Sequence, residues 1–139
     1  MLLLRHSLTL GWCLALSACG KQPSPAPDPL AGLTLDQGKR WVADDHTRKS
    51  AQALLEATRR RAQELDVAAT KTLGGELQSL LDQLVAGCTM QGPAHSALHV
   101  FLEALMPRVQ AMRGEDAKAA ARSREEVVSL LSRFSTYFE

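Results

Sequence analysis

The residues that could do chemistry are concentrated in one short segment of the chain, between positions 88 and 99. Cys88, Met90, His95 and His99 place a thiol, a thioether and two imidazoles close together in the sequence. Thiolate, thioether and imidazole are donors that suit Cu(I), and thiolate combined with imidazole also suits Zn²⁺. The segment therefore predicts a soft-metal site, with copper or zinc as the ion and Met90 as the weak fourth ligand.

The spacing of these residues favours a shared site. His95 and His99 are four positions apart, so on a helix their side chains lie on one side, at the edge of its apolar stripe. Cys88 continues an apolar row of the preceding helix and is expected to face inward. We expect the side chains to meet at one end of the fold, with His46 as a further possible ligand beside two aspartates.

The same residues also fit a purely structural interpretation, in which they close one end of the core without a metal. Cysteine is often a small buried hydrophobe, methionine fills gaps, and histidine is common at the boundary of a core. Distance separates the two interpretations, because a metal needs its ligand atoms within about 2.0–2.3 Å of one centre.

Several other chemistries lack their motifs in this chain. It contains no Cys-x-x-Cys-His for covalent haem, no paired Glu-x-x-His for a di-iron centre, and no His-Glu-x-x-His. A Gly-rich phosphate loop and a Gly-x-Ser-x-Gly elbow are also absent. We therefore expect a protein that is not an enzyme.

The first residues have the pattern of a secretion signal that ends at a cysteine. A mostly apolar run over residues 8–18 follows Arg5 and is shorter than the ~20 residues that span a bilayer. The sequence LSAC at positions 16–19 resembles the lipobox of bacterial lipoproteins. That resemblance implies cleavage before Cys19, a diacylglycerol thioether on its sulfur, and acylation of the new amine. An ordinary secretory peptide with an incidental cysteine is the alternative.

Lipidation would make the membrane a permanent partner through Cys19, because each buried methylene contributes about 0.8 kcal/mol. The domain would face the periplasm, and Gly20 in place of an aspartate favours the outer membrane.

Cys13 leaves with residues 1–18, so Cys88 becomes the one free thiol and no internal disulfide can form. The 16 basic and 15 acidic residues give a net charge of +1, which offers no electrostatic case for nucleic acid.

Composition and periodicity predict the elements that hold this site. Alanine and leucine supply 43 of the 139 residues, isoleucine is absent, and only seven valines occur, which favours helices over sheets. Residues 19–32 carry four of the six prolines and should form a spacer of about 3.1 Å per residue. Within the domain, 33–139, an extended arm or hairpin should precede four amphipathic stretches with apolar positions over 51–65, 73–85, 94–112 and 117–138. Short connections favour an all-α, up-down-up-down four-helix bundle, with the second helix starting after Gly74 and Gly75.

Three segments of the domain carry a second resemblance. They are KRWVADDHTRKS at 39–50, CTMQGPAHSALHVFL at 88–102 and the terminal SRFSTYFE. Together they resemble a group of small, uncharacterised helical envelope proteins of bacteria, over about residues 35–138. The resemblance implies that Cys88, Met90, His95 and His99 belong together. The group pattern has an acidic residue after the first histidine, where this chain has Ser96, so a carboxylate that could orient the imidazole is missing.

Overall fold

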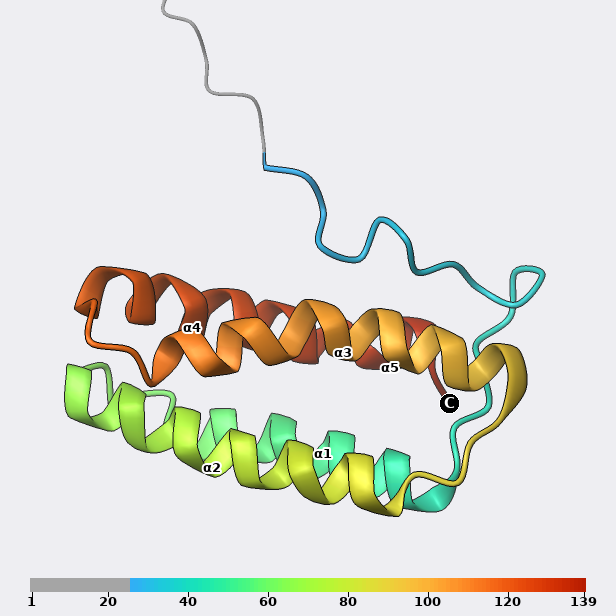
Figure 1. Cartoon of the computed structure of the whole chain (residues 1–139), viewed down its shortest axis with the longest axis horizontal. Coiled ribbons are helices and arrows are strands. Elements are labelled where there is room, and N and C mark those ends of the chain that lie inside the picture. Colours follow the sequence, from blue (N-terminus) through green and yellow to red (C-terminus); the bar gives the residue numbers. More distant parts are fainter. Residues whose placement is uncertain (1–25) are drawn as a thin grey trace, which may run out of the picture.

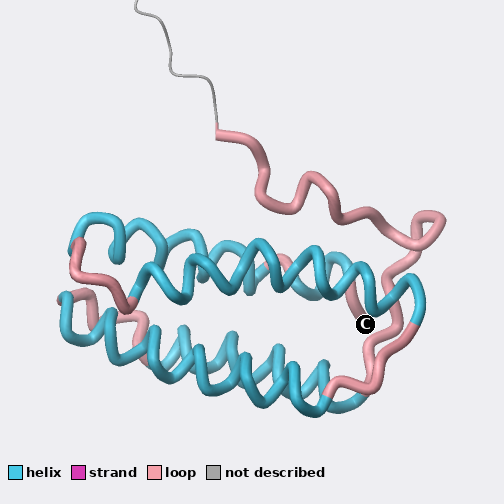
Figure 2. Tube along the Cα trace, viewed as in Figure 1, coloured by secondary structure: helices cyan, strands magenta, loops and turns pink. Residues whose placement is uncertain are grey.

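The computed structural model describes residues 26–139, and within that range the chain forms helices, turns and extended segments without a strand. The helices are α1 (Asp45–Arg60), α2 (Val67–Gly87), α3 (Gly92–Met112), α4 (Ala117–Ser132) and the single-turn α5 (Phe134–Tyr137). Figure 1 shows α1 and α2 in one layer and α3 and α4 in the other, and Figure 2 shows the connections at alternate ends. The predicted all-α four-helix bundle is confirmed.

Three of the long helices begin at an aspartate that caps their first turn. The side chains of Asp44, Asp66 and Asp116 each accept hydrogen bonds from backbone N–H groups that have no partner within the helix. Helix α3 begins differently, with Pro93 in its first turn, where the missing N–H of proline costs nothing. These residues set the points at which the chain turns back on itself.

The core lies between the two layers and is built from aliphatic rows that repeat every three or four residues. Fully buried members include Leu54 and Ala57 of α1, Leu73, Leu77, Leu81 and Leu84 of α2, Leu98, Phe101, Leu105, Val109 and Met112 of α3, and Val127, Leu130 and Leu131 of α4. The rings of Phe134 and Phe138 stack with their centroids 4.7 Å apart and pack edge-on against Phe101. The aromatic C-terminus therefore closes one end of the core.

The helix boundaries correct two expectations. Helix α2 does not start after Gly74 and Gly75 but at Val67, because Asp66 caps it two turns earlier. Gly74 is needed for packing, since a Cβ there would lie 2.9 Å from Cγ of Arg113 and 3.0 Å from Cβ of Met112. The glycine that weakens the helix locally thus lets α2 approach the end of α3.

The apolar faces also differ from expectation at three positions. Helix α1 ends at Arg60, so Leu65 falls in the following loop and its side chain is 74% exposed. Val85 and Val128, which the periodicity assigned to the core, lie on exposed parts of α2 and α4. At these positions the helices present more apolar surface than the core covers.

The residues before the first helix pack on the bundle rather than extend away from it. Leu30, which the sequence analysis placed in the proline-rich spacer, is 1% exposed and belongs to the core. Asp28 forms a two-pronged ion pair with Arg133, at 2.8 and 2.9 Å. This pair lowers the pKa of Asp28 to about 2, chiefly through the hydrogen bonds from Arg133 and then the backbone N–H of Leu30. Cys19, the signal segment 1–18 and the spacer up to residue 25 lie outside the described residues.

The expected arm makes a tight turn and then pairs with the C-terminus. Asp36 and Lys39 exchange two backbone hydrogen bonds of 2.8 Å around Gln37 and Gly38, which both have a left-handed φ. The chain then runs parallel to the C-terminal residues, and Trp41 bridges to Phe138. The indole N–H of Trp41 donates to the carbonyl of Thr34 at 2.7 Å.

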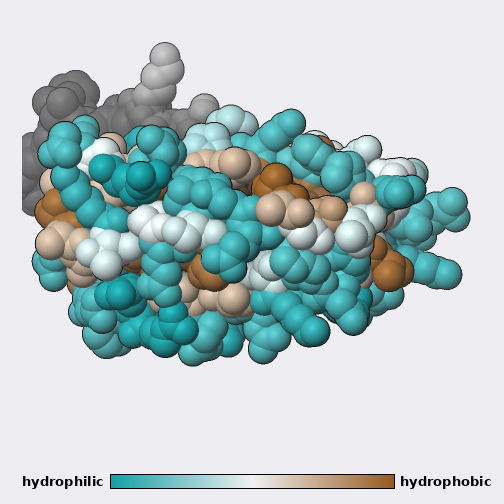
Figure 3. Space-filling view, turned by 60° about the horizontal axis from the view of Figure 1, so that its bottom comes forward, coloured by the Kyte–Doolittle hydropathy of each residue, from teal (hydrophilic) through white to brown (hydrophobic). Residues whose placement is uncertain are grey.

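The surface of the bundle is mixed in character. On the face in view in Figure 3, hydrophobic residues form small patches separated by hydrophilic ones. Among residues 26–139, no helix has the length and the apolar character that a membrane span requires.

Candidate metal centre

The candidate ligands lie at the end of the bundle where α2 turns into α3. The connection over residues 88–91 lies beside the start of α1, at the end opposite the α1–α2 and α3–α4 turns (Figure 1). Cys88 follows directly after α2, and His95 and His99 lie on the first turns of α3. Cys88 and His95 are half-buried, whereas His99 is exposed. The cluster is therefore open to solvent on one side.

The thiol and the two imidazoles form a continuous chain of contacts. Sγ of Cys88 lies 3.8 Å from Nδ1 of His95, and Nε2 of His95 lies 2.9 Å from Nε2 of His99. The two rings meet edge to face, with centroids 4.5 Å apart. A contact between two Nε2 atoms requires one to carry a proton and the other to accept it, because two N–H groups would repel. Replacing that proton by a cation would satisfy both nitrogens.

The two imidazole nitrogens lie closer together than a metal bound between them would hold them. A tetrahedral ion bonded at about 2.0–2.1 Å to two imidazole nitrogens holds them about 3.3 Å apart. The Nε2 atoms, at 2.9 Å, need only a small separation to reach that value. His95, however, presents Nδ1 to the thiol and Nε2 to His99. An ion shared by all three side chains therefore requires a rotamer change at Cys88 or His95.

Accordingly, no group of three or more His, Cys, Asp and Glu side chains within residues 26–139 is arranged to hold a metal as the side chains stand. Met90 is half-buried and packs against the core next to Cys88. The Nε2 of His46 lies 2.9 Å from the carbonyl of Gln83 and 3.5 Å from Oγ of Ser50. That nitrogen is thus engaged with α2 and its own helix rather than with the cluster.

A carboxylate outside the predicted ligand set, that of Asp44, holds the loop of the site in place. Asp44 caps α1 by accepting from the backbone N–H of Thr47 at 2.6 Å. Its second oxygen accepts from both the backbone N–H and the hydroxyl of Thr89, at 2.6 and 2.7 Å. Thr89 follows Cys88, so Asp44 fixes the thiol-bearing end of α2 to the start of α1.

These hydrogen bonds control the ionisation of Asp44. Partial burial opposes its negative charge, but the hydrogen bonds from Thr47 and Thr89 outweigh that effect and hold the pKa of Asp44 well below its ordinary value. The carboxylate is therefore charged at neutral pH. An aspartate just before an amphipathic stretch is a sequence signal for a helix cap, but the bond of Asp44 to Thr89, 45 positions away, has no sequence signal.

Together, the fold and this cluster define a four-helix bundle with thiol and imidazole side chains gathered at one end. Comparison of the chain with protein-family models, with curated proteins and with solved structures finds no match.

Proposed function

We propose that the chain is a lipid-anchored protein of the bacterial cell envelope whose helical domain binds a soft metal ion, Cu(I) or Zn²⁺. His95 and His99 are the primary ligands, Cys88 supplies a thiolate, and Met90 is a weak fourth ligand. The proposal assigns no catalytic activity to the chain and no nucleic-acid partner.

The contact between the two imidazoles carries the metal-binding proposal. Nε2 of His95 and Nε2 of His99 face each other at 2.9 Å on the open side of the bundle. Sγ of Cys88 lies 3.8 Å from Nδ1 of the same His95 ring, so a thiol adjoins the imidazole pair. This donor set matches the ions that prefer sulfur and imidazole nitrogen.

The envelope location rests on the sequence. The apolar run over residues 8–18 and the LSAC motif support export and lipid attachment at Cys19, with the domain in the periplasm and the outer membrane favoured. Burial of several acyl chains would hold the domain at the membrane surface.

A second candidate function is a scaffold of the envelope that binds no metal. It is favoured by the orientation of His95, whose two nitrogens face different partners instead of one point. In that case Cys88 and Met90, which pack against the core, serve with the two histidines to close one end of the bundle.

Titration of the purified full chain with Cu(I) and with Zn²⁺, followed by thermal unfolding, separates the two candidates. A bound metal raises the free energy of unfolding by RT ln(1 + [L]/Kd), about 2.7 kcal/mol at a hundredfold excess over Kd. We expect this gain in the wild type and its loss in His99→Ala and Cys88→Ser. The gain should also fall at acidic pH, because protonated imidazole and neutral thiol do not bind metal.

His46→Ala is the matched control, because His46 is also exposed and lies at the same end of the bundle but contacts Gln83. It should keep the full metal-dependent gain. An equal metal-dependent increase in the free energy of unfolding in the wild type and all three variants would place the metal elsewhere. No increase in any of the four proteins would favour the scaffold function.

A further inference from the structure

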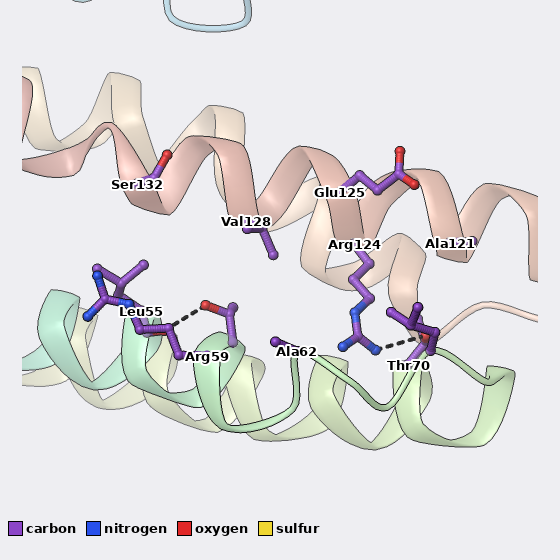
Figure 4. A pocket seen from close by; sticks show the side chains of 11 residues that line it. Leu55, Arg59, Ala62, Thr70, Ala121, Arg124, Glu125, Val128 and Ser132 are labelled. Atoms are coloured by element: carbon purple, nitrogen blue, oxygen red, sulfur yellow. Dashed lines mark hydrogen bonds between the residues drawn. The ribbon is translucent and has the colours of Figure 1, made fainter.

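A cleft with a volume of about 600 Å³ opens between α1 and α4, away from the thiol–imidazole cluster. Its walls are mostly apolar and include Leu55, Ala62, Leu65, Ala121 and Val128. Figure 4 shows Val128 reaching down from α4 toward Leu55 and Ala62 on the opposite wall. The volume falls within the range of about 300–1,000 Å³ that is typical of small-molecule sites.

Two arginines of the cleft carry charges that no carboxylate neutralises. Arg124 is only 6% exposed, and its guanidinium donates to the backbone carbonyls of Arg61 and Glu64 and, at 3.4 Å, to the hydroxyl of Thr70. Those acceptors have no formal charge, so the positive charge of Arg124 remains. Among residues 26–139, neither Arg124 nor the exposed Arg59 forms an ion pair with an acidic side chain.

The one acidic residue in the wall does not offset this charge within the cleft. Glu125 is exposed, and Figure 4 shows its carboxylate on the far side of α4 from the guanidinium of Arg124. Arg59 lines the opposite wall, on α1. The interior of the cleft is therefore apolar and positively charged.

We propose that this cleft binds an organic anion with an apolar body, of the aliphatic carboxylate class. The apolar walls would bury the alkyl chain, and each buried methylene contributes about 0.8 kcal/mol. The carboxylate would lie toward the exposed Arg59, and the buried charge of Arg124, at the other end of the cleft in Figure 4, would add to the positive potential along the wall. An anion would also offset the cost of holding the Arg124 charge out of water.

Photo-crosslinking of the full chain in membranes tests this proposal. The ligands are a twelve-carbon carboxylic acid that carries a diazirine on its chain and the alcohol of the same chain. Tryptic peptides that contain Leu55, Ala62 or Val128 should carry the label from the acid. The alcohol should label them several-fold less, because it lacks the charge that Arg124 and Arg59 attract.

Two pairs of variants locate the site. Val128→Trp fills the cleft and should lower labelling by roughly tenfold, whereas Val85→Trp, at another exposed valine that lies on α2 outside the cleft, should leave it unchanged. Arg59→Gln should lower labelling by the acid about threefold and leave labelling by the alcohol unaffected, as expected for an exposed charge. Arg122→Gln, on α4 but outside the cleft, is its control.

Three results would overturn the proposal. Equal labelling by the acid and by the alcohol would show that the cleft does not select for a negatively charged ligand. Labelling that persists in Val128→Trp, or that maps to peptides outside α1, α4 and the α1–α2 loop, would place the ligand elsewhere. Because none of these variants touches Cys88, His95 or His99, the outcome is independent of the metal titration.

Discussion

Replacing Asp44 by alanine removes the cap of α1 and the anchor of the site loop in one step. The loss of a helix cap costs about 1 kcal/mol. The two hydrogen bonds from Thr89 to the carboxylate add roughly 1–2 kcal/mol, less than for a buried charged acceptor because the site is partly exposed. We therefore expect Asp44→Ala to lower the free energy of unfolding by about 2–3 kcal/mol.

In a domain of this size, about 1 kcal/mol corresponds to roughly 4 °C, so the melting temperature of Asp44→Ala should fall by roughly 8–12 °C. Asp66→Ala provides the control, because Asp66 caps α2 through the N–H of Ala69 without a bond to a distant loop. That variant should lose roughly 4 °C. Thermal unfolding followed by circular dichroism measures both.

The effect of Asp44 should also depend on pH. Its pKa is lower in the folded chain than in the unfolded chain, so the unfolded chain binds more protons as the solution becomes acidic. The stabilisation is complete above the unfolded pKa of about 3.9 and disappears as the pH falls toward the lower folded pKa. The difference between wild type and Asp44→Ala should therefore shrink below pH ~4. Equal losses in Asp44→Ala and Asp66→Ala at neutral pH would refute the role of Thr89.

Three further predictions concern the anchor, the core and the N-terminal segment. Cys19→Ser should abolish labelling with radioactive palmitate and move the chain into the aqueous phase on detergent partitioning; an unlabelled wild type would exclude lipidation. Leu81→Asp places an unpaired charge at a position that is 0% exposed and should cost several kcal/mol, with loss of the helical circular dichroism signal. Because the pKa of Asp28 is lowered to about 2 by Arg133, the amide resonance of Leu30 should shift between pH ~4 and ~2 in the wild type. The shift should be absent in Asp28→Asn.

The bundle was predictable because its core residues repeat with the period of a helix. Most of the two rows over 73–85 and 94–112 could be read from the sequence and are buried as expected, from Leu73 to Leu84 and from Leu98 to Met112, whereas Val85 is exposed. The start of α2 could not be predicted in the same way. The low helix propensity of Gly74 and Gly75 suggested a later start, whereas Gly74 lies inside the helix because α2 packs closely against Met112 there. Propensity acts locally, whereas the packing that overrides it joins distant parts of the chain.

The end of α1 shows the same limit. The helical repeat of apolar residues predicted that the apolar face of α1 continues to Leu65, but the helix ends at Arg60. The carbonyls of Arg61 and Glu64 instead accept hydrogen bonds from Arg124, which lies some sixty positions away. A charged side chain on α4 would be assigned to the solvent face from sequence, so neither its burial nor the cleft beside it was predictable.

At the candidate site, the proximity of the side chains followed from their spacing but their orientation did not. The four-residue interval brings His95 and His99 together on one helix, and the position of Cys88 at the end of α2 brings the thiol to the same place. Which ring nitrogen faces which partner depends on side-chain torsions that the sequence does not reveal. Metal binding therefore stays a prediction.

X-ray absorption spectroscopy of the full chain loaded with one equivalent of Cu(I) or Zn²⁺ identifies the ligand atoms of the metal. We expect imidazole nitrogens at about 2.0–2.1 Å and one sulfur at about 2.3 Å for zinc, with the sulfur signal absent in Cys88→Ser. A first shell that contains only oxygen and nitrogen in the wild type, or a sulfur signal that persists in Cys88→Ser, would contradict the assignment of Cys88, His95 and His99 as the ligands.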